Sequence, residues 1–385
     1  MIIGRRELVF GSLAAAAAAA CGSKSSSQRS MPTPTPEPDK PAPKSILVLG
    51  GTGFLGPHVI TTALARGHKV TMFNRGKTRP ELFPDVEKLR GDRDGKLESL
   101  QGRQWDAVVD TSGYVPRIVK MSAELLAPNV KQYIFISSIS VYAAGAPVGA
   151  DESAPLEKLL DPTSEDIKGN DFKNYGALKA LSEQAAEAAM PGRTANIRPG
   201  LIIGPGDMTG RFTHWPTRFA EGGAVLCPGD GSTPVQFIDG RDLGDWIVHL
   251  IENNTVGVMN AIGPEKPITM KEVITQVSVA VGDKERVATP VWVDWKFLEK
   301  HEVAPWAEMP MWIPNEGEDA GFGTTSKARA LEAGIRFRPV GDSAKDVLAW
   351  LDTLPQDQRK RARSSGIKRD KEDKILAEWK ALKKS

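Results

Sequence analysis

The sequence predicts an α/β fold with a doubly wound parallel sheet, followed by a smaller and less regular C-terminal part. A glycine-rich turn at 50–56 follows an apolar run at 45–49 and opens a helical segment. Alternation of strands with helices is typical of parallel sheets. After residue 200 this alternation lapses, and Gly, Pro and Trp become frequent. Further apolar runs recur with helical segments between them, at 106–110, 133–137, 194–197 and 235–238.

The glycine-rich turn predicts a dinucleotide site. Glycines at 50 and 51 permit a tight strand-to-helix turn, the next glycine lets the backbone approach a pyrophosphate, and the last lets the helix pack on the strand. The helix that continues through 59–65 presents unpaired N–H groups and a positive dipole end to the phosphates. A second strand is expected at 70–73. The cofactor contacts predicted here are Gly50, Gly53, Phe54, Leu55 and Gly56.

Residues 1–21 differ in kind from the rest of the chain and predict an export signal. Arg5-Arg6 precede an apolar stretch at 8–20 that is too short to span a bilayer, which takes about 20 residues. The pair resembles a twin-arginine signal, and residues 18–21 resemble a lipobox, so Cys21 is the expected lipid attachment site. We therefore expect an exported, membrane-anchored protein on the periplasmic or outer face of the cell envelope. A plain alanine-rich helix is the alternative.

Residues 22–44 are rich in Ser and then Pro, which predicts an extended tether before a folded part that starts near Ser45. If Cys21 carries lipid, Cys227 has no partner for an intrachain disulfide. The net charge of +2 gives no reason to expect nucleic acid as a partner. Near the C-terminus, the apolar spacing within 370–384 predicts a helix that docks on the domain.

Tyr175 and Lys179 are spaced by four residues at the start of a predicted helix, so both lie on one face, one turn apart. A phenol has a pKa near 10, and a nearby ammonium lowers this pKa toward the working range of an acid or base. The strand predicted at 133–137 ends in two hydroxyl residues, Ser137 and Ser138. Because ligands of open α/β sheets bind at the carboxyl ends of strands, these hydroxyls should border the same crevice as the glycine turn.

Taken together, these motifs resemble the extended or atypical branch of the short-chain dehydrogenase/reductase superfamily, which contains the NAD-dependent epimerases and dehydratases. The similarity is strongest to a bacterial subgroup related to chloroplast stem-loop-binding proteins. It implies a Rossmann-type NAD(P)-binding domain over 45–200 and a mainly substrate-binding part over 201–385, with the sheet completed by 234–251. The segments that carry it are 50–56, 137–142, 175–179, 198–206 and 236–243.

The resemblance also implies roles for individual residues. Tyr175 would be the general acid or base, and Lys179 would hold the nicotinamide ribose and lower the pKa of Tyr175. Ser138 would orient the substrate oxygen, with Ser137 as second choice. The other cofactor contacts implied are Asn74, Arg75, Asp92, Thr111, Ser112, Gly113, Ser137 and Arg198. The substrate contacts expected are Arg211, His214, Gln236 and Arg241.

Departures from the family pattern narrow the chemistry. Asn74-Arg75 stand where NAD-selective members carry an acidic residue, and Arg75 can pair with a 2′-phosphate, so NADP is favoured and NAD is the second choice. Ile139-Ser140 stand where 4,6-dehydratases carry an Asp-Glu pair, which disfavours a dehydratase. The five histidines show no metal-ligand spacing, so no metal is expected.

The sequence thus predicts an NAD(P)-dependent oxidoreductase or epimerase that acts on a hydroxyl or carbonyl group of a small molecule, a sugar or nucleotide-sugar, with a tightly held cofactor. An exported enzyme must regenerate a trapped cofactor in each cycle, which favours a redox-neutral reaction. The alternatives are an RNA-binding or RNA-processing protein on the same fold and a non-catalytic nucleotide-binding scaffold. An aromatic content of 6% and the export signal both disfavour RNA. A homodimer is left open.

Overall fold

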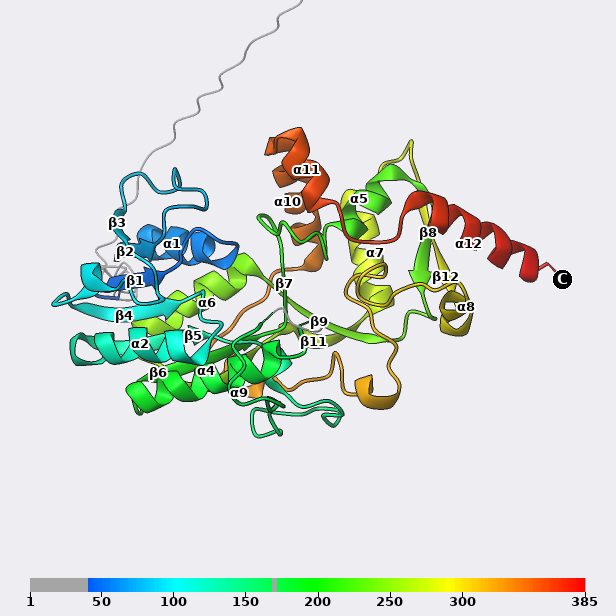
Figure 1. Cartoon of the computed structure of the whole chain (residues 1–385). Helices are drawn as coiled ribbons and strands as arrows, with labels where there is room; N and C mark the ends of the chain where they lie inside the picture. Colours follow the sequence, from blue (N-terminus) through cyan, green and yellow to red (C-terminus); the bar gives the residue numbers. More distant parts are fainter. Residues whose placement is uncertain (1–40, 168–171, 385) are drawn as a thin grey trace, which may run out of the picture. The chain divides into compact units, whose positions relative to one another are not determined.

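Seven parallel strands form the central sheet, in the order β10-β6-β5-β4-β1-β2-β3 (Figure 1). The structure is a computed structural model and describes residues 41–167 and 172–384. The inner strands are buried on both faces and are therefore almost continuously apolar. The strands are β1 (Ser45–Leu49), β2 (Lys69–Asn74), β3 (Glu87–Arg90), β4 (Trp105–Asp110), β5 (Val130–Ile136), β6 (Thr194–Pro199) and β10 (Gly257–Ala261).

Helices cover both faces of this sheet. Helices α1 (Leu55–Ala65) and α6 (Gly240–Glu252) pack together on one face, and α2 (Pro116–Leu126) and α4 (Tyr175–Ala189) pack together on the other. Helix α1 ends where Gly67 adopts a left-handed backbone with φ +84°. The predicted doubly wound α/β fold is therefore confirmed.

The strand expected to complete this sheet lies elsewhere, and the prediction for 234–251 is corrected. Strand β9 (Pro234–Asp239) pairs with β7 (Leu201–Ile203) and β11 (Gly263–Thr269) in a separate three-stranded sheet. The edge position beside β6 belongs to β10, which follows α6 and buries Met259 and Ala261 under the helices. Helix α9 (Ala328–Glu332) also packs on β10. The chain therefore returns to the first part after residue 200, and no single boundary separates the two parts.

The second part has its own apolar core, between α5 (His214–Glu221), α7 (Met270–Val281), α10 (Val340–Thr353) and a parallel pair of strands, β8 (Gly223–Pro228) and β12 (Ala288–Val293). Cys227 on β8 is buried and free. The remaining helices are α8 (Trp295–Lys300), α11 (Gln356–Ala362) and α12 (Arg369–Leu382), with 3-10 turns η1 (Glu98–Leu100), η2 (Ala127–Asn129), η3 (Ile139–Val141) and η4 (Gly317–Asp319).

The C-terminal helix forms as predicted, and Ile375 buries its side chain in the second core. Within residues 41–167 and 172–384, no helix has the length and apolar character needed to cross a membrane. The predicted export signal, Cys21 and nearly all of the tether lie outside the described residues.

Candidate active site

A cavity of about 1600 Å³ lies at the carboxyl ends of the central strands and extends into the second part of the chain. It brings most of the predicted site residues together, although they come from widely separated segments. The predicted residues that line it are Gly50, Gly53, Phe54, Leu55, Gly56, Asn74, Arg75, Asp92, Thr111, Ser112, Ser137, Ser138, Tyr175, Lys179, Arg211 and Gln236.

The glycine turn has the geometry that its sequence predicts. Gly50 and Gly51 have φ values of +102° and +84°, a left-handed backbone that side chains rarely tolerate. A Cβ atom at Gly56 would lie 2.5 Å from the Cα of Gly51, because α1 starts directly against the turn. A Cβ at Gly53 would meet no atom within 4 Å, since this residue faces the cavity. The turn is therefore open toward the cavity at Gly53, and we call this open surface the cradle.

The two glycines allow a matched test of this cradle. We expect Gly56→Ala to push the turn out of place, with a stability loss of about 1–3 kcal/mol and at least about tenfold weaker nucleotide binding. Gly53→Ala should leave the unfolding free energy near that of wild type and still weaken nucleotide binding. Denaturant unfolding and nucleotide titration measure the two effects. Equal nucleotide affinity in Gly53→Ala and wild type would place the phosphates elsewhere.

Two side chains brace the turn from outside. The amide of Asn74 donates to the carbonyl oxygen of Gly50 at 3.0 Å, and its own oxygen accepts from the backbone N–H of Gly76 at 2.9 Å. The guanidinium of Arg79 donates to the carbonyl oxygen of Thr52 through Nε at 3.0 Å and Nη2 at 2.7 Å. Arg79 was not predicted from the sequence, because nothing in its local pattern shows which carbonyl its guanidinium will contact.

Lys179 lies at the centre of the cavity wall and is almost completely buried. Its ammonium donates to the carbonyl oxygens of Gly113 at 2.6 Å and Ile136 at 2.5 Å, and lies 4.3 Å from the ring centre of Phe135. Gly113 does not itself line the cavity and acts through this contact. Burial lowers the pKa of Lys179 to about 7, against the opposing charge of Asp110. The ammonium is thus close to losing its proton at neutral pH.

A buried charge network supports this wall from beneath. Asp110, at the end of β4, accepts from Arg93 at 2.5 and 2.7 Å and from the phenol of Tyr133 at 2.8 Å. Arg93 also donates to the hydroxyl of Ser122 at 2.8 Å. This network was not predicted from the sequence, although a carboxylate at the end of a buried strand indicates a buried partner.

Tyr175 starts helix α4 and faces the same cavity. Burial, and then the nearby Tyr114, raise its pKa, while a hydrogen bond with Ser138 and the positive charge of Arg211 lower it. Lys179, which was expected to lower this pKa, turns its ammonium toward backbone carbonyls instead. The phenol therefore carries its proton at neutral pH.

The two serines after β5, Ser137 and Ser138, differ in their hydrogen bonds. The Ser138 hydroxyl accepts from the backbone N–H of Ser140 at 3.1 Å, donates to the hydroxyl of Ser140 at 3.1 Å and lowers the pKa of Tyr175. The Ser137 hydroxyl is buried, lines the cavity and has no hydrogen-bond partner among the described residues. Because buried hydroxyls nearly always have partners, this oxygen points to a ligand.

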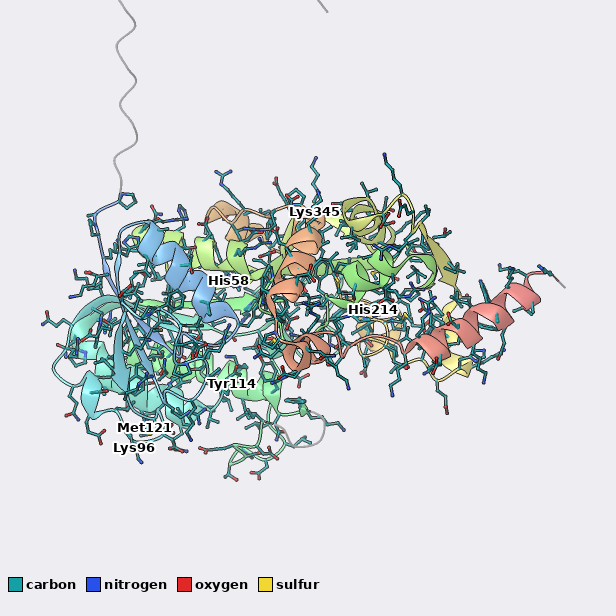
Figure 2. The ribbon with its side chains drawn as sticks, turned by 90° about the horizontal axis from the view of Figure 1, so that it is seen from above. His58, Lys96, Tyr114, Met121, His214 and Lys345 are labelled. Atoms are coloured by element: carbon teal, nitrogen blue, oxygen red, sulfur yellow. The ribbon has the colours of Figure 1, made fainter. Side chains whose placement is uncertain are left out.

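Besides Gly113, three predicted site residues do not line the cavity, namely Arg198, Arg241 and His214, and these predictions are corrected. The guanidinium of Arg198 is buried against Glu183 at 2.7 Å, and that of Arg241 binds Asp239 at 2.7 Å. His214 is buried in the second part under the backbone of Gly366, well away from Tyr114 (Figure 2). The two guanidinium groups are thus paired with carboxylates of the protein itself, and the His214 imidazole is buried outside the cavity.

The burial of His214 predicts a loss of stability in acid. Burial and then Arg218 lower the pKa of His214 to about 4. Between pH 6.5 and 4 the unfolded chain takes up a proton that the folded protein does not. The free energy of unfolding therefore decreases as the pH is lowered through this range, by about 3 kcal/mol at most. We expect His214→Gln to flatten this part of the stability curve measured by urea unfolding. Parallel curves for variant and wild type from pH 7 to pH 4 would contradict the assignment.

Gln236 fixes the far wall of the cavity. Its amide donates to the carbonyl oxygen of Thr325 at 2.7 Å, and its oxygen accepts from the backbone N–H of the same residue at 3.1 Å. Arg211 is held by a bond from its Nε to the hydroxyl of Thr209 at 3.0 Å. In the described part of the chain, no group of three or more His, Cys, Asp or Glu residues could hold a metal ion.

The fold and the cavity together define an α/β protein with a glycine turn after its first strand and with Tyr175 and Lys179 at the carboxyl ends of its central strands. The profile of the NAD-dependent epimerase/dehydratase family matches residues 46–262. The chain therefore belongs to this family, as the resemblance of its motifs predicted.

Individual relatives agree with this assignment. The chain is 25% identical over 326 residues to the epimerase family protein SDR39U1 of Bos taurus, covering 79% of this chain and 99% of that protein. It is 27% identical over 244 residues to the chloroplast stem-loop binding protein of 41 kDa b of Arabidopsis thaliana, covering 59% of this chain and 60% of that protein. The crystal structure of human SDR39U1 with NADPH has the same fold, with a TM-score of 0.52 and 21% sequence identity. The match covers 80% of this chain and 100% of that one.

Proposed function

We propose that this protein is an NAD(P)-dependent oxidoreductase or epimerase that acts on a hydroxyl or carbonyl group through Ser138, Tyr175 and Lys179. One observation carries the proposal: Ser138, Tyr175 and Lys179 all line the cavity that begins at the glycine turn. The open cradle at Gly53 and the partnerless hydroxyl of Ser137 fit a bound dinucleotide. When bound, the nicotinamide supplies hydride transfer at its C4 atom.

The residues of the chain then handle the proton. In reduction, the protonated phenol of Tyr175 donates to the carbonyl oxygen, which Ser138 orients by a hydrogen bond. In oxidation, the phenolate accepts the hydroxyl proton, and the charge of Arg211 stabilises this form. Lys179 would hold the ribose hydroxyls. Because the pKa of Lys179 is about 7, the charged form that donates these hydrogen bonds predominates below neutral pH.

NADP is the cofactor that the charges favour. Arg75 and Lys77 line the end of the cavity beyond β2. We expect Arg75→Ala to weaken NADP binding by about 10–100-fold, the value of a lost charge-assisted hydrogen bond. The affinity of this variant for NAD should stay within a few-fold of the wild-type value, and it serves as the internal control in the same titration. A parallel loss for both nucleotides would show that Arg75 supports the turn rather than the 2′-phosphate.

Two measurements test the function itself. Mass spectrometry of the nucleotide released on denaturation identifies NADP, NAD or neither. Incubation of the loaded protein with candidate sugars, followed by a search for hydrogen exchange at nicotinamide C4, detects turnover. Release of RNA fragments without any dinucleotide would support the RNA-binding alternative and overturn the enzyme proposal.

We also propose that the protein is exported and anchored by lipid on Cys21. The signal-like residues 1–21 support this proposal, and they favour a redox-neutral reaction because a cofactor carried out of the cell must be regenerated in place. Cys21→Ala should move the protein from the membrane to the soluble envelope fraction. Recovery of wild-type protein from the cytoplasm alone, or from the envelope without nucleotide, would contradict this.

A further inference from the structure

The cavity has two chemically different halves. Its nucleotide half carries the glycine turn and the cations Arg75 and Lys77. Its other half, beyond Tyr175, is built by the second part of the chain. There the described lining residues include one cation, Arg211, against two carboxylates, Glu318 and Asp319. Phosphate-binding groups are therefore gathered at one end of the cavity.

The second half has little positive charge. Arg211 donates from Nε to the hydroxyl of Thr209 at 3.0 Å, and it is the one cation among the described lining residues of this half. Two carboxylates, Glu318 and Asp319, outweigh its charge. A diphosphate carries about two negative charges and needs several donors or cations to replace its lost hydration.

The carboxylates continue into a neighbouring pocket of about 420 Å³. This pocket shares Trp306, Ile313 and Asp319 with the main cavity, and no Lys, Arg or His is among its described lining residues. Its other lining residues are Trp295, Glu299, Pro305, Pro314 and Glu316. The volume next to the active site is therefore acidic and aromatic.

The aromatic side chains are held in fixed positions. The rings of Trp306 and Phe322 meet edge to face at 5.5 Å, and the backbone N–H of Trp306 donates to the carbonyl oxygen of Trp312 at 2.9 Å. The double contact between Gln236 and Thr325 fixes the segment that follows the two carboxylates. Such a pre-formed wall presents flat apolar faces and hydrogen-bond acceptors together.

We propose that the substrate is a sugar ring without a phosphate or diphosphate group, neutral or carrying amino groups. Carboxylates accept hydrogen bonds from hydroxyl and ammonium groups, and aromatic rings pack on the apolar C–H face of a sugar. The same carboxylates repel a nucleoside diphosphate and so exclude nucleotide-sugars. This inference rests on the proposed function and narrows its substrate.

Binding of UDP to full-length, nucleotide-loaded protein is the first test, with calorimetry as readout. We expect no binding tighter than about 1 mM for wild type, and at least about tenfold tighter binding for the double variant Glu318→Lys/Asp319→Lys. The exposed Glu285→Lys is the control and should leave UDP binding unchanged. UDP binding by wild type tighter than about 1 mM, or no gain in the double variant, would overturn the proposal.

A second test compares substrates. Glucosamine and glucose should bind the loaded protein more tightly than UDP-glucosamine and UDP-glucose. Glu318→Gln/Asp319→Gln should weaken binding of the amino sugar by at least about tenfold with unchanged NADP affinity. Preference for the nucleotide-sugars would overturn this inference and leave the proposed function standing. Absence of any bound dinucleotide would instead reject the proposed function.

Discussion

Replacement of Tyr175 by Phe is expected to lower kcat by about a thousandfold, within the range that general acid–base groups contribute. The variant keeps the ring and loses only the phenolic hydroxyl on the cavity wall, so the cavity and the nucleotide affinity should not change. The measurement is the rate of C4 hydrogen exchange at saturating substrate, together with an NADP titration.

The chain offers a matched control for this variant. Tyr114 lines the same cavity, and its ring centre lies 6.5 Å from that of Tyr175. We expect Tyr114→Phe to retain activity within a few-fold. If Tyr114→Phe loses as much activity as Tyr175→Phe, or if Tyr175→Phe remains fully active, the acid has been assigned to the wrong residue.

The pH dependence of wild type follows from the same group. Because burial raises the pKa of Tyr175, the phenol keeps its proton through neutral pH. Reduction, which uses the protonated form, should therefore be constant across neutral pH and decline in alkali, and oxidation should rise with pH. An opposite trend in the two directions would exclude a phenol as the proton carrier.

Removal of the Glu372 carboxylate is expected to cost about 3–5 kcal/mol of unfolding free energy, the usual loss when one member of a buried ion pair is deleted. Glu372 is almost fully buried in α12. It accepts from Arg218 at 2.7 Å and from the backbone N–H of Leu226 at 2.9 Å, which joins α12 to α5 and β8. Glu372→Ala would leave the Arg218 guanidinium buried without its counter-charge.

Denaturant unfolding of three variants tests this expectation. Glu378→Ala on the same helix removes a half-exposed carboxylate 3.4 Å from His301 and should cost no more than about 1 kcal/mol. The double variant Arg218→Met/Glu372→Leu should recover much of the loss, because it leaves no unpaired charge. A loss of less than 1 kcal/mol in Glu372→Ala would show that water reaches the guanidinium.

The predicted residues that the structure brings around one cavity are those with a local signal in the sequence. The strand, glycine turn and helix at 45–65 are consecutive, so their geometry follows from residue type alone. Tyr175 and Lys179 lie one helical turn apart, and Ser138 follows a buried strand. Since parallel strands end at a common edge, these local features were enough to place them around one cavity.

Long-range pairing accounts for the predictions that were wrong. Arg198 and Arg241 lie at motif positions in the sequence, but in the structure they form ion pairs with Glu183 and Asp239. Strand β9 pairs with β7 and β11 in the separate sheet, whereas β10, which follows α6, takes the edge position beside β6. These pairings join segments that are far apart in the sequence.

By itself, the sequence determined the α/β class, the nucleotide turn and the catalytic tyrosine and lysine that we propose, because each depends on neighbours within a few residues. The tertiary structure alone decided the bracing of the turn by Arg79 and the acidic, aromatic half of the cavity around Trp306 and Glu318. These features join segments far apart in the chain. A residue's type does not reveal which distant group will neutralise its charge or satisfy its hydrogen bonds.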